Sequence, residues 1–220
     1  MKKKVALIHT GFALVEVLTK LFNKIIPEAE LTHIVDDSLL REVLARGKVT
    51  NPVRSRMLYY YRAAQDYRVD VIFNVCSSVG EAADAAAQVI DTPIVKIDEV
   101  MAEEAVKRAQ KIGVAATLKT TLDPTCRLIE KKAKEAGKDI SIERTLCPGA
   151  FEKLMEGNPQ EHDRIVLEGV KELAKKCEVV VFAQGSMARL LDKMDGGMSD
   201  KILTSPERGV KQAKEVLGLK

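Results

Sequence analysis

The chain has 220 residues, of which 46% are hydrophobic, so it can bury a core as one large domain or as two small ones. Its 35 basic and 32 acidic residues leave a net charge of +3 and are scattered, so nucleic acid is not an expected partner. No apolar run approaches the roughly 20 residues that cross a bilayer, and residues 1–4 lead into a predicted strand rather than a signal peptide. We therefore expect a cytoplasmic protein that does not bind membranes.

In the first half of the chain, short apolar runs alternate with stretches that have helical apolar spacing. Start and stop signals bound the expected helices, among them Pro27, Gly47 and a capping Asp98. We predict strands at residues 4–10, 30–36, 71–75 and 93–97, and helices at 12–26, 39–46, 52–67, 79–90 and 99–110.

The pattern starts again at Lys111. Asp123 and Pro124 predict the cap and first residue of a helix, and Ser205-Pro206 predicts the start of the last one. We predict strands at residues 112–117, 140–146, 178–182 and 201–204, a glycine-rich loop at 195–199, and helices at 123–137, 151–156, 160–176, after 186 and from 206.

The spacing of strand ends indicates an internal duplication. Thr10 and Thr117 end the first strands of the two halves, 107 residues apart, and Cys76 and Gln184 end the third strands, 108 residues apart. We expect an α/β protein with two lobes, each a four-stranded, mostly parallel sheet flanked by helices. The lobes would be residues 1–98, with 206–220 a candidate to pack back on them, and 99–205. Ligands gather at the carboxyl ends of parallel strands, which favours a site between the lobes.

Cys76 is the strongest candidate for chemistry. It follows the apolar run 71–75 and precedes Ser77 and Ser78, and Ser78 with Glu81 predicts a capping box at the start of a helix. A thiolate is stabilised at such a turn, and carboxylates bind there, so Cys76 could serve as acid, base or nucleophile beside a carboxylate held by Ser77 and Ser78. The alternatives are that Cys76 is a small buried apolar residue and that Ser78 only caps the helix.

Weaker candidates carry a simpler explanation each. Thr117 and Thr121 could hold a carboxylate oxygen, or could form local backbone hydrogen bonds. His9 and His162 lie near candidate positions, although a solvated first helical turn explains His162 equally well, and His33 is expected to be structural.

The remaining cysteines and glycines point to no further class of site. Cys126, Cys147 and Cys177 form no C-x-x-C pair with one another or with Cys76, so neither zinc nor a disulfide framework is expected; Cys147, just past a strand, is the reserve candidate. The sequence has no dinucleotide or P-loop glycine pattern and no complete G-x-S-x-G motif. Dinucleotide binding, nucleoside triphosphate binding and serine hydrolase activity therefore have no support.

Three segments together resemble the aspartate/glutamate racemase superfamily, which includes hydantoin racemases, arylmalonate decarboxylases and maleate isomerases. They are Val75-Cys76-Ser77-Ser78, the run 182–187 and the strand 112–117. In that family one cysteine from each half faces the substrate's α-carbon; one thiolate removes a proton and the opposite thiol returns one, without a cofactor. The resemblance implies a cofactor-independent isomerase of a small carboxylate, and a homo-oligomer, commonly a dimer.

The second family cysteine is replaced by Gln184, whose amide neither takes nor delivers a proton at neutral pH. The resemblance therefore implies Cys76 as acid, base or nucleophile and Gln184 as a contact from the opposite face. Three alternatives stay open: a one-cysteine decarboxylase, an isomerase of a small di-acid, and a non-catalytic carboxylate-binding protein. The residues expected to bind the substrate are Thr10, Ser77, Ser78, Thr117 and Ser186.

Overall fold

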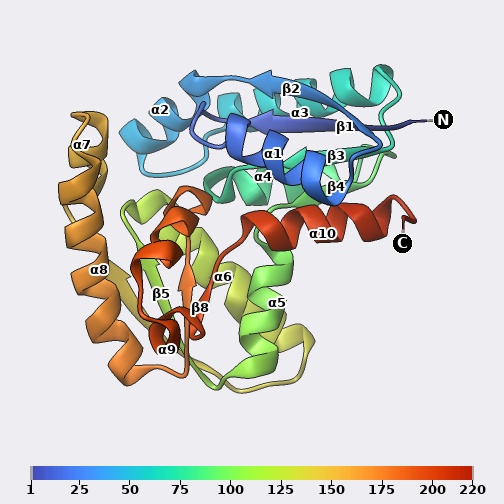
Figure 1. Ribbon diagram of the computed structural model, residues 1–220. Coiled ribbons are helices and arrows are strands. Elements are labelled where there is room, and N and C mark those ends of the chain that lie inside the picture. Colours follow the sequence, from blue (N-terminus) through green and yellow to red (C-terminus); the bar gives the residue numbers. More distant parts are fainter. Residues whose placement is uncertain (1, 220) are drawn as a thin grey trace. The chain divides into compact units, whose positions relative to one another are not determined.

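The computed structural model describes residues 2–219, which divide into two compact units (Figure 1). Unit 1 contains the chain up to Ile97 together with the segment from Pro206 onwards, and unit 2 is Asp98–Ser205. Each unit holds one four-stranded parallel sheet with helices around it, so the expected α/β class is confirmed.

The sheet of unit 1 has the strand order β2-β1-β3-β4. Its central strands are almost wholly apolar because both faces of the sheet are covered. Ile8 pairs with Asn74, so the carboxyl ends of β1 and β3 lie side by side and the residues that follow them are neighbours. The strands are β1 (Lys3–His9), β2 (Ala29–Val35), β3 (Val71–Asn74) and β4 (Ile94–Lys96).

Helices cover both faces of this sheet. One core layer contains the side chains of Ile8 and Ile72 with α3 and α4, and the other contains Leu7 and Phe73 with α1 and α10. In α10, a Cβ at Gly209 would lie 2.8 Å from the Ile97 carbonyl oxygen, so only glycine permits this close packing. The helices are α1 (Val15–Ile25), α2 (Asp37–Arg46), α3 (Asn51–Asp66), the 3₁₀ helix η1 (Ser77–Val79), α4 (Gly80–Ala86) and α10 (Pro206–Val216).

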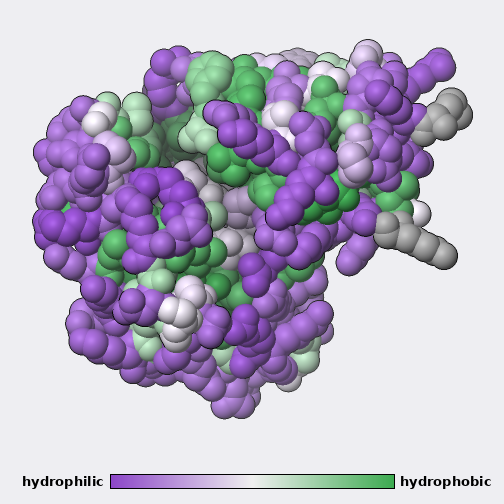
Figure 2. All heavy atoms as spheres, in the orientation of Figure 1, coloured by the Kyte–Doolittle hydropathy of each residue, from purple (hydrophilic) through white to green (hydrophobic). Residues whose placement is uncertain are grey.

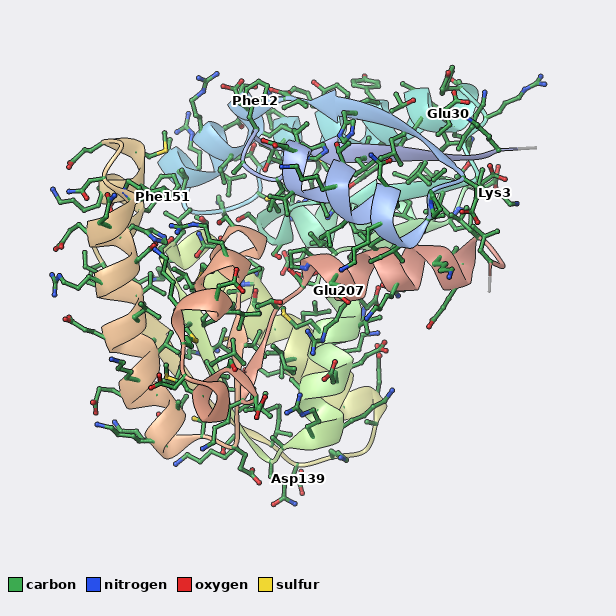
Figure 3. All side chains as sticks on the ribbon, viewed as in Figure 1. Lys3, Phe12, Glu30, Asp139, Phe151 and Glu207 are labelled. Atoms are coloured by element: carbon green, nitrogen blue, oxygen red, sulfur yellow. The ribbon has the colours of Figure 1, made fainter. Side chains whose placement is uncertain are left out.

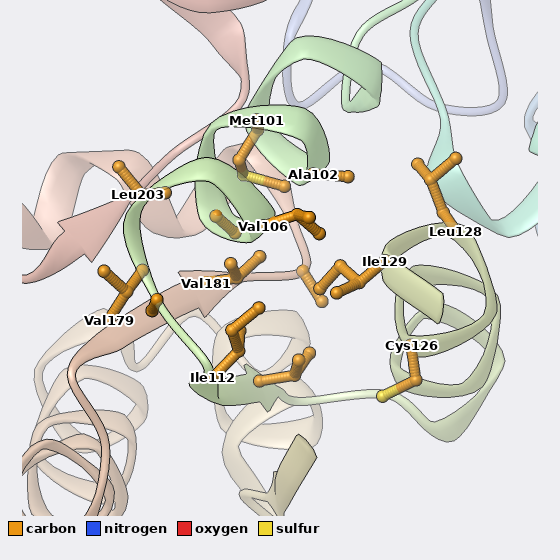
Figure 4. Packing of buried hydrophobic residues seen from close by; sticks show 14 of the residues in the cluster. Met101, Ala102, Val106, Ile112, Cys126, Leu128, Ile129, Val179, Val181 and Leu203 are labelled. Atoms are coloured by element: carbon orange, nitrogen blue, oxygen red, sulfur yellow. The ribbon is translucent and has the colours of Figure 1, made fainter. Parts of the chain in front are cut away.

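Unit 2 repeats this topology with the strand order β6-β5-β7-β8. Figure 4 shows the core layer in which Ile112 and Val181 of the sheet pack against Val106 and Ile129 of two helices. The strands are β5 (Lys111–Ala116), β6 (Ser141–Leu146), β7 (Val179–Phe182) and β8 (Ile202–Leu203). The helices are α5 (Glu99–Arg108), α6 (Lys119–Glu135), α7 (Ala150–Met155), α8 (Pro159–Lys176), the 3₁₀ helix η2 (Gly185–Lys193) and α9 (Gly196–Ser199).

Corresponding elements of the two units keep a nearly constant spacing along the chain. The helices α3 and α8 begin 108 residues apart, and so do β3 and β7, and β4 and β8. The helix after the fourth strand is exchanged: α5 follows β4 but belongs to unit 2, and α10 follows β8 but belongs to unit 1. The duplication therefore extends to the way each unit is completed by a helix.

Three details of the predicted elements were wrong. The helix expected at residues 79–90 starts as η1 at Ser77 and ends at Ala86, and its N-cap is Val79, whose side chain makes no capping bond, rather than Ser78. Helix α6 begins at Lys119 and includes Pro124, because a proline within the first two turns removes only one backbone bond while Thr121 and its neighbours are buried. The predicted loop at residues 195–199 contains the short helix α9.

Hydrophilic residues cover most of the face shown in Figure 2. Among residues 2–219, no helix has the length and apolar character that crossing a membrane requires.

Candidate active site

Cys76 directly follows β3, where the extended backbone turns into η1. The Thr10 hydroxyl, the amide and hydroxyl of Ser78 and the amide of Val79 lower the pKa of its thiol, so they are donors that favour the thiolate form. The Cys76 side chain is partly exposed, whereas Thr10, Ser77 and Ser78 are buried. The structure thus brings together all four of the site residues that the sequence suggested in this unit.

The loop after β1 explains how Thr10 reaches the sulfur. Since β1 and β3 are paired and parallel, Thr10 emerges beside Cys76 at the same edge of the sheet. Two residues later the chain has turned outward: Phe12 has 71% of its surface exposed (Figure 3). The carboxyl end of β1 therefore supplies one inward hydroxyl before the loop begins.

Burial raises the pKa of the Cys76 thiol, and the hydrogen bonds from Thr10, Ser78 and Val79 oppose this rise without cancelling it. The sequence-based expectation of a lowered pKa is therefore wrong. The turn after Cys76 is a 3₁₀ turn that precedes α4, and the walls of the site come from elements that sequence alone does not place around the sulfur. The resting thiol is protonated at neutral pH.

A buried polar pair lies behind Cys76. The hydroxyl of Tyr61 donates to Oδ1 of Asn74 at 2.9 Å, and Nδ2 of Asn74 donates to the backbone carbonyl of Cys76 at 3.1 Å. Both side chains are fully buried, and burial raises the pKa of Tyr61 well above its usual value, so its hydroxyl keeps its proton. The sequence analysis missed this pair; the available signal was an asparagine inside an apolar strand, which is costly unless it is hydrogen-bonded.

In unit 2, Gln184 and Thr117 bind each other across the carboxyl ends of β7 and β5. Oε1 of Gln184 accepts from the Thr117 amide at 2.7 Å, and Nε2 of Gln184 donates to the Thr117 hydroxyl at 2.8 Å. The Gln184 side chain therefore satisfies a backbone donor that the sheet leaves open. Ser186 lies two residues further on, half-buried in η2.

His162 is buried, so its interpretation as part of a solvated turn is wrong. Its Nδ1 lies 2.7 Å from Oδ1 of Asp163. The other oxygen of Asp163, Oδ2, accepts from Arg189 at 2.7 Å and from Lys193 at 2.6 Å. Burial raises the pKa of Asp163, but the hydrogen bonds from Arg189, Lys193 and His162 outweigh it and leave the pKa well below its usual range. The cluster ties the first turns of α8 to η2.

His9, which is buried, and His33, which is half-buried, form a second polar chain, in unit 1. Nε2 of His9 lies 2.9 Å from Nδ1 of His33, and Nε2 of His33 lies 3.2 Å from the Thr19 hydroxyl. Since Thr19 donates its proton to the Val15 carbonyl, it accepts from His33, and His33 in turn accepts from His9. Burial, with the nearby His33, lowers the pKa of His9 to about 4, so both rings are neutral at pH 7.

Cys147, the reserve candidate, is packed in the core. It belongs to the cluster that contains Phe182 and Met187, its sulfur would lie 3.0 Å from a Cβ at position 169, and burial raises its pKa to about 11. Burial also raises the pKa of Cys126 and of Cys177. Within residues 2–219, no three side chains of His, Cys, Asp or Glu are grouped so that they could hold a metal ion.

Comparison with solved structures identifies proteins of the same fold. A putative Asp/Glu racemase from Yersinia pestis gives a TM-score of 0.76 at 13% identity, with 98% of this chain and 99% of that chain covered. Glutamate racemase from Francisella tularensis, in complex with D-glutamate, gives 0.73 at 12% identity, with 99% and 81% covered. Allantoin racemase from Klebsiella pneumoniae gives 0.68 at 17% identity, with 99% and 89% covered.

Curated protein sequences gave no significant match. The model of the family described as Asp/Glu/Hydantoin racemase matches residues 6–213, which is nearly the whole chain. On this match, the chain belongs to the Asp/Glu/Hydantoin racemase family.

Proposed function

We propose that this protein is a cofactor-independent enzyme that acts on a carbon acid next to a carboxylate, with the Cys76 thiol as its acid/base group. The observation that carries the proposal is the set of donors around the Cys76 sulfur at the carboxyl end of β3. A thiol that served only as packing would need no hydroxyl and amide donors beside it. Membership of a racemase family supports an isomerase as the reaction class.

The protonation state of Cys76 favours the role of acid. Because burial raises its pKa, the resting thiol carries a proton that it can deliver to a substrate carbanion. In that step the S–H bond breaks, a C–H bond forms, and the sulfur becomes a thiolate. The donors from Thr10, Ser78 and Val79 then bind the negative sulfur, and solvent returns the proton.

The substrate carboxylate needs hydrogen-bond donors, because the α-proton is too weakly acidic unless the enolate-like charge is stabilised. We assign this role to the hydroxyls of Ser77 and Thr117, with Ser78, whose hydroxyl faces the sulfur, as a further contact of the substrate. The Thr117 hydroxyl accepts from Nε2 of Gln184 at 2.8 Å and donates to Oε1 of Gln184 at 3.1 Å, so in this role it would turn its hydrogen from Gln184 to the substrate. We place Thr10, Gln184 and Ser186 among the residues that contact the substrate.

The amide at position 184 argues against symmetric racemisation by two thiols, because Gln184 can neither remove nor return a proton. A second candidate function follows from this observation: decarboxylation of a malonate-type acid, or isomerisation of a small di-acid, with protonation from one side by Cys76. In a decarboxylase, loss of carbon dioxide generates the carbanion, and no second base is needed. Binding of a small carboxylate without turnover is the rival in another class.

Proton NMR in deuterium oxide tests the proposal. Amino acids, hydantoins, malonates and unsaturated or hydroxylated di-acids would be incubated with wild type, Cys76→Ala and Cys147→Ala, the last as a control for loss of another cysteine at a strand end. We expect one substrate class to lose an α-proton signal, a carboxylate or a double-bond geometry with wild type and Cys147→Ala only. If no acid reacts while the same acids raise the melting temperature, the protein is a binding protein.

A further inference from the structure

Asn74 and Tyr61 interrupt a core layer that is otherwise apolar. Asn74 is the last residue of β3, and Tyr61 lies on α3, which packs on the same face of the sheet with Ile8 and Ile72. Both side chains have 0% of their surface exposed. A buried amide and a buried phenol are costly unless they bond to each other and to a third group.

The third group is the backbone of Cys76. The Cys76 carbonyl accepts from Nδ2 of Asn74 at 3.1 Å and from the amide of Val79 at 3.2 Å. Two donors on one carbonyl fix the direction of the peptide that leaves Cys76. The direction of that peptide sets where the next amides point, and the amides of Ser78 and Val79 are among the donors to the sulfur.

Unit 2 provides an internal comparison. The positions 108 residues later are Phe182 for Asn74 and Gly169 for Tyr61, so the corresponding place beneath the third strand has no polar pair. Phe182, the last residue of β7, lies in an apolar cluster, and Gln184 stands two residues later where unit 1 has the thiol of Cys76. The polar pair therefore occurs in the half of the molecule that carries the cysteine.

We propose that Asn74, held in place by Tyr61, is the positioning residue of Cys76: it fixes the Cys76 carbonyl so that the following turn directs its amides at the sulfur. Asn74 acts through the Cys76 backbone and makes no contact with substrate. The proposal rests on the proposed function only in so far as the reactivity of Cys76 matters to the protein.

The test uses the double variant Tyr61→Phe/Asn74→Leu, which replaces both polar groups with apolar groups of similar shape and leaves neither partner buried and unpaired. The rate of alkylation of Cys76 by iodoacetamide is followed by peptide mass spectrometry from pH 6 to 11. We expect the midpoint of the pH profile to rise by about one unit, so that the rate at pH 8 falls about tenfold, because the buried walls remain while thiolate donors are lost. An unchanged or lowered midpoint would overturn the proposal.

Two further variants separate positioning from general loss of stability. Ile72→Val removes a methyl group from the same core layer and should leave the midpoint unchanged. Tyr61→Phe alone keeps the bond from Asn74 to the Cys76 carbonyl and should shift the midpoint by less than the double variant. If no acid slows the alkylation of wild-type Cys76 at any pH of the profile, the proposed function fails; if acids protect Cys76 but the double variant matches wild type, only the role of Asn74 fails.

Discussion

The ends of β3 and β7 occupy equivalent places in two sheets of the same topology, yet they use hydrogen bonds in opposite ways. At the end of β3, side-chain and backbone donors converge on the Cys76 sulfur, which can gain or lose a proton. After β7, the side-chain amide of Gln184 forms hydrogen bonds with the backbone amide and the hydroxyl of Thr117. One strand end is arranged around a titratable thiol and the other around a neutral amide, so the two units share a topology but differ in the chemistry of the residue that follows the third strand.

The largest effect that should distinguish the units is acid sensitivity at the end of the first strand, where unit 1 has His9 and unit 2 has Ala116. The folded state lowers the pKa of His9 from 6.5 to about 4, so His9 contributes stability above pH 6.5 that is lost as the pH falls towards 4. A shift of this size corresponds to about 3 kcal/mol of unfolding free energy.

Urea titrations of wild type and His9→Gln at pH 7 and pH 4 measure this contribution. We expect the loss of stability between the two pH values to be smaller in His9→Gln by about 3 kcal/mol. Carboxylates elsewhere titrate equally in both proteins and cancel. Parallel curves for the two proteins would show that His9 is not the acid-sensitive group.

The next largest effect is expected from breaking the hydrogen bonds between Gln184 and Thr117 in unit 2. Gln184→Leu leaves the buried Thr117 amide without its acceptor, which should cost about 2 kcal/mol. Gln184→Glu keeps an oxygen acceptor at this position and should cost less. The midpoints of urea denaturation compare the stability of the two variants. Equal losses of stability in Gln184→Leu and Gln184→Glu would contradict the role of Gln184 as acceptor for the Thr117 amide.

The smallest predicted effect concerns the N-caps of the equivalent helices α3 and α8. Thr50 accepts from the Val53 amide and Asn158 accepts from the Glu161 amide, in the same place 108 residues apart. Each substitution to alanine should cost about 1 kcal/mol. Thr50→Ala should cost more than Asn158→Ala, because the Thr50 hydroxyl also donates to Glu42 at 2.5 Å, and Thr50→Ser should recover most of the loss in thermal unfolding.

The sequence was a good guide wherever the information is local. Apolar runs located the strands, and the constant spacing between strand ends predicted two sheets. The positions of Thr10 and Cys76 directly after their strands predicted that both lie at the same edge of one sheet. It was a poor guide where several elements meet. The sign of the Cys76 pKa shift depends on burial by neighbouring segments, and the Asn74–Tyr61 bond depends on how α3 packs on β3.

Gln184 shows the same limit in another form. The glutamine after the third strand was visible in the sequence, but its partner Thr117 lies 67 residues away and is brought to it by the register between β5 and β7. Likewise, the proline at position 124 suggested a helix start, whereas burial of the preceding turn extends α6 to Lys119.

Because the last helices are exchanged, the two units are completed at different points of synthesis on the ribosome. Unit 2 is one continuous segment and has all its residues once Ser205 has been synthesised. Unit 1 is incomplete until α10 has been synthesised, because Val210 and Ala213 of that helix complete the core layer over Phe73. Unit 1 therefore begins before unit 2 in the chain but is completed after it, and the Cys76 turn forms in a unit whose second core layer closes only after all of unit 2 has been synthesised.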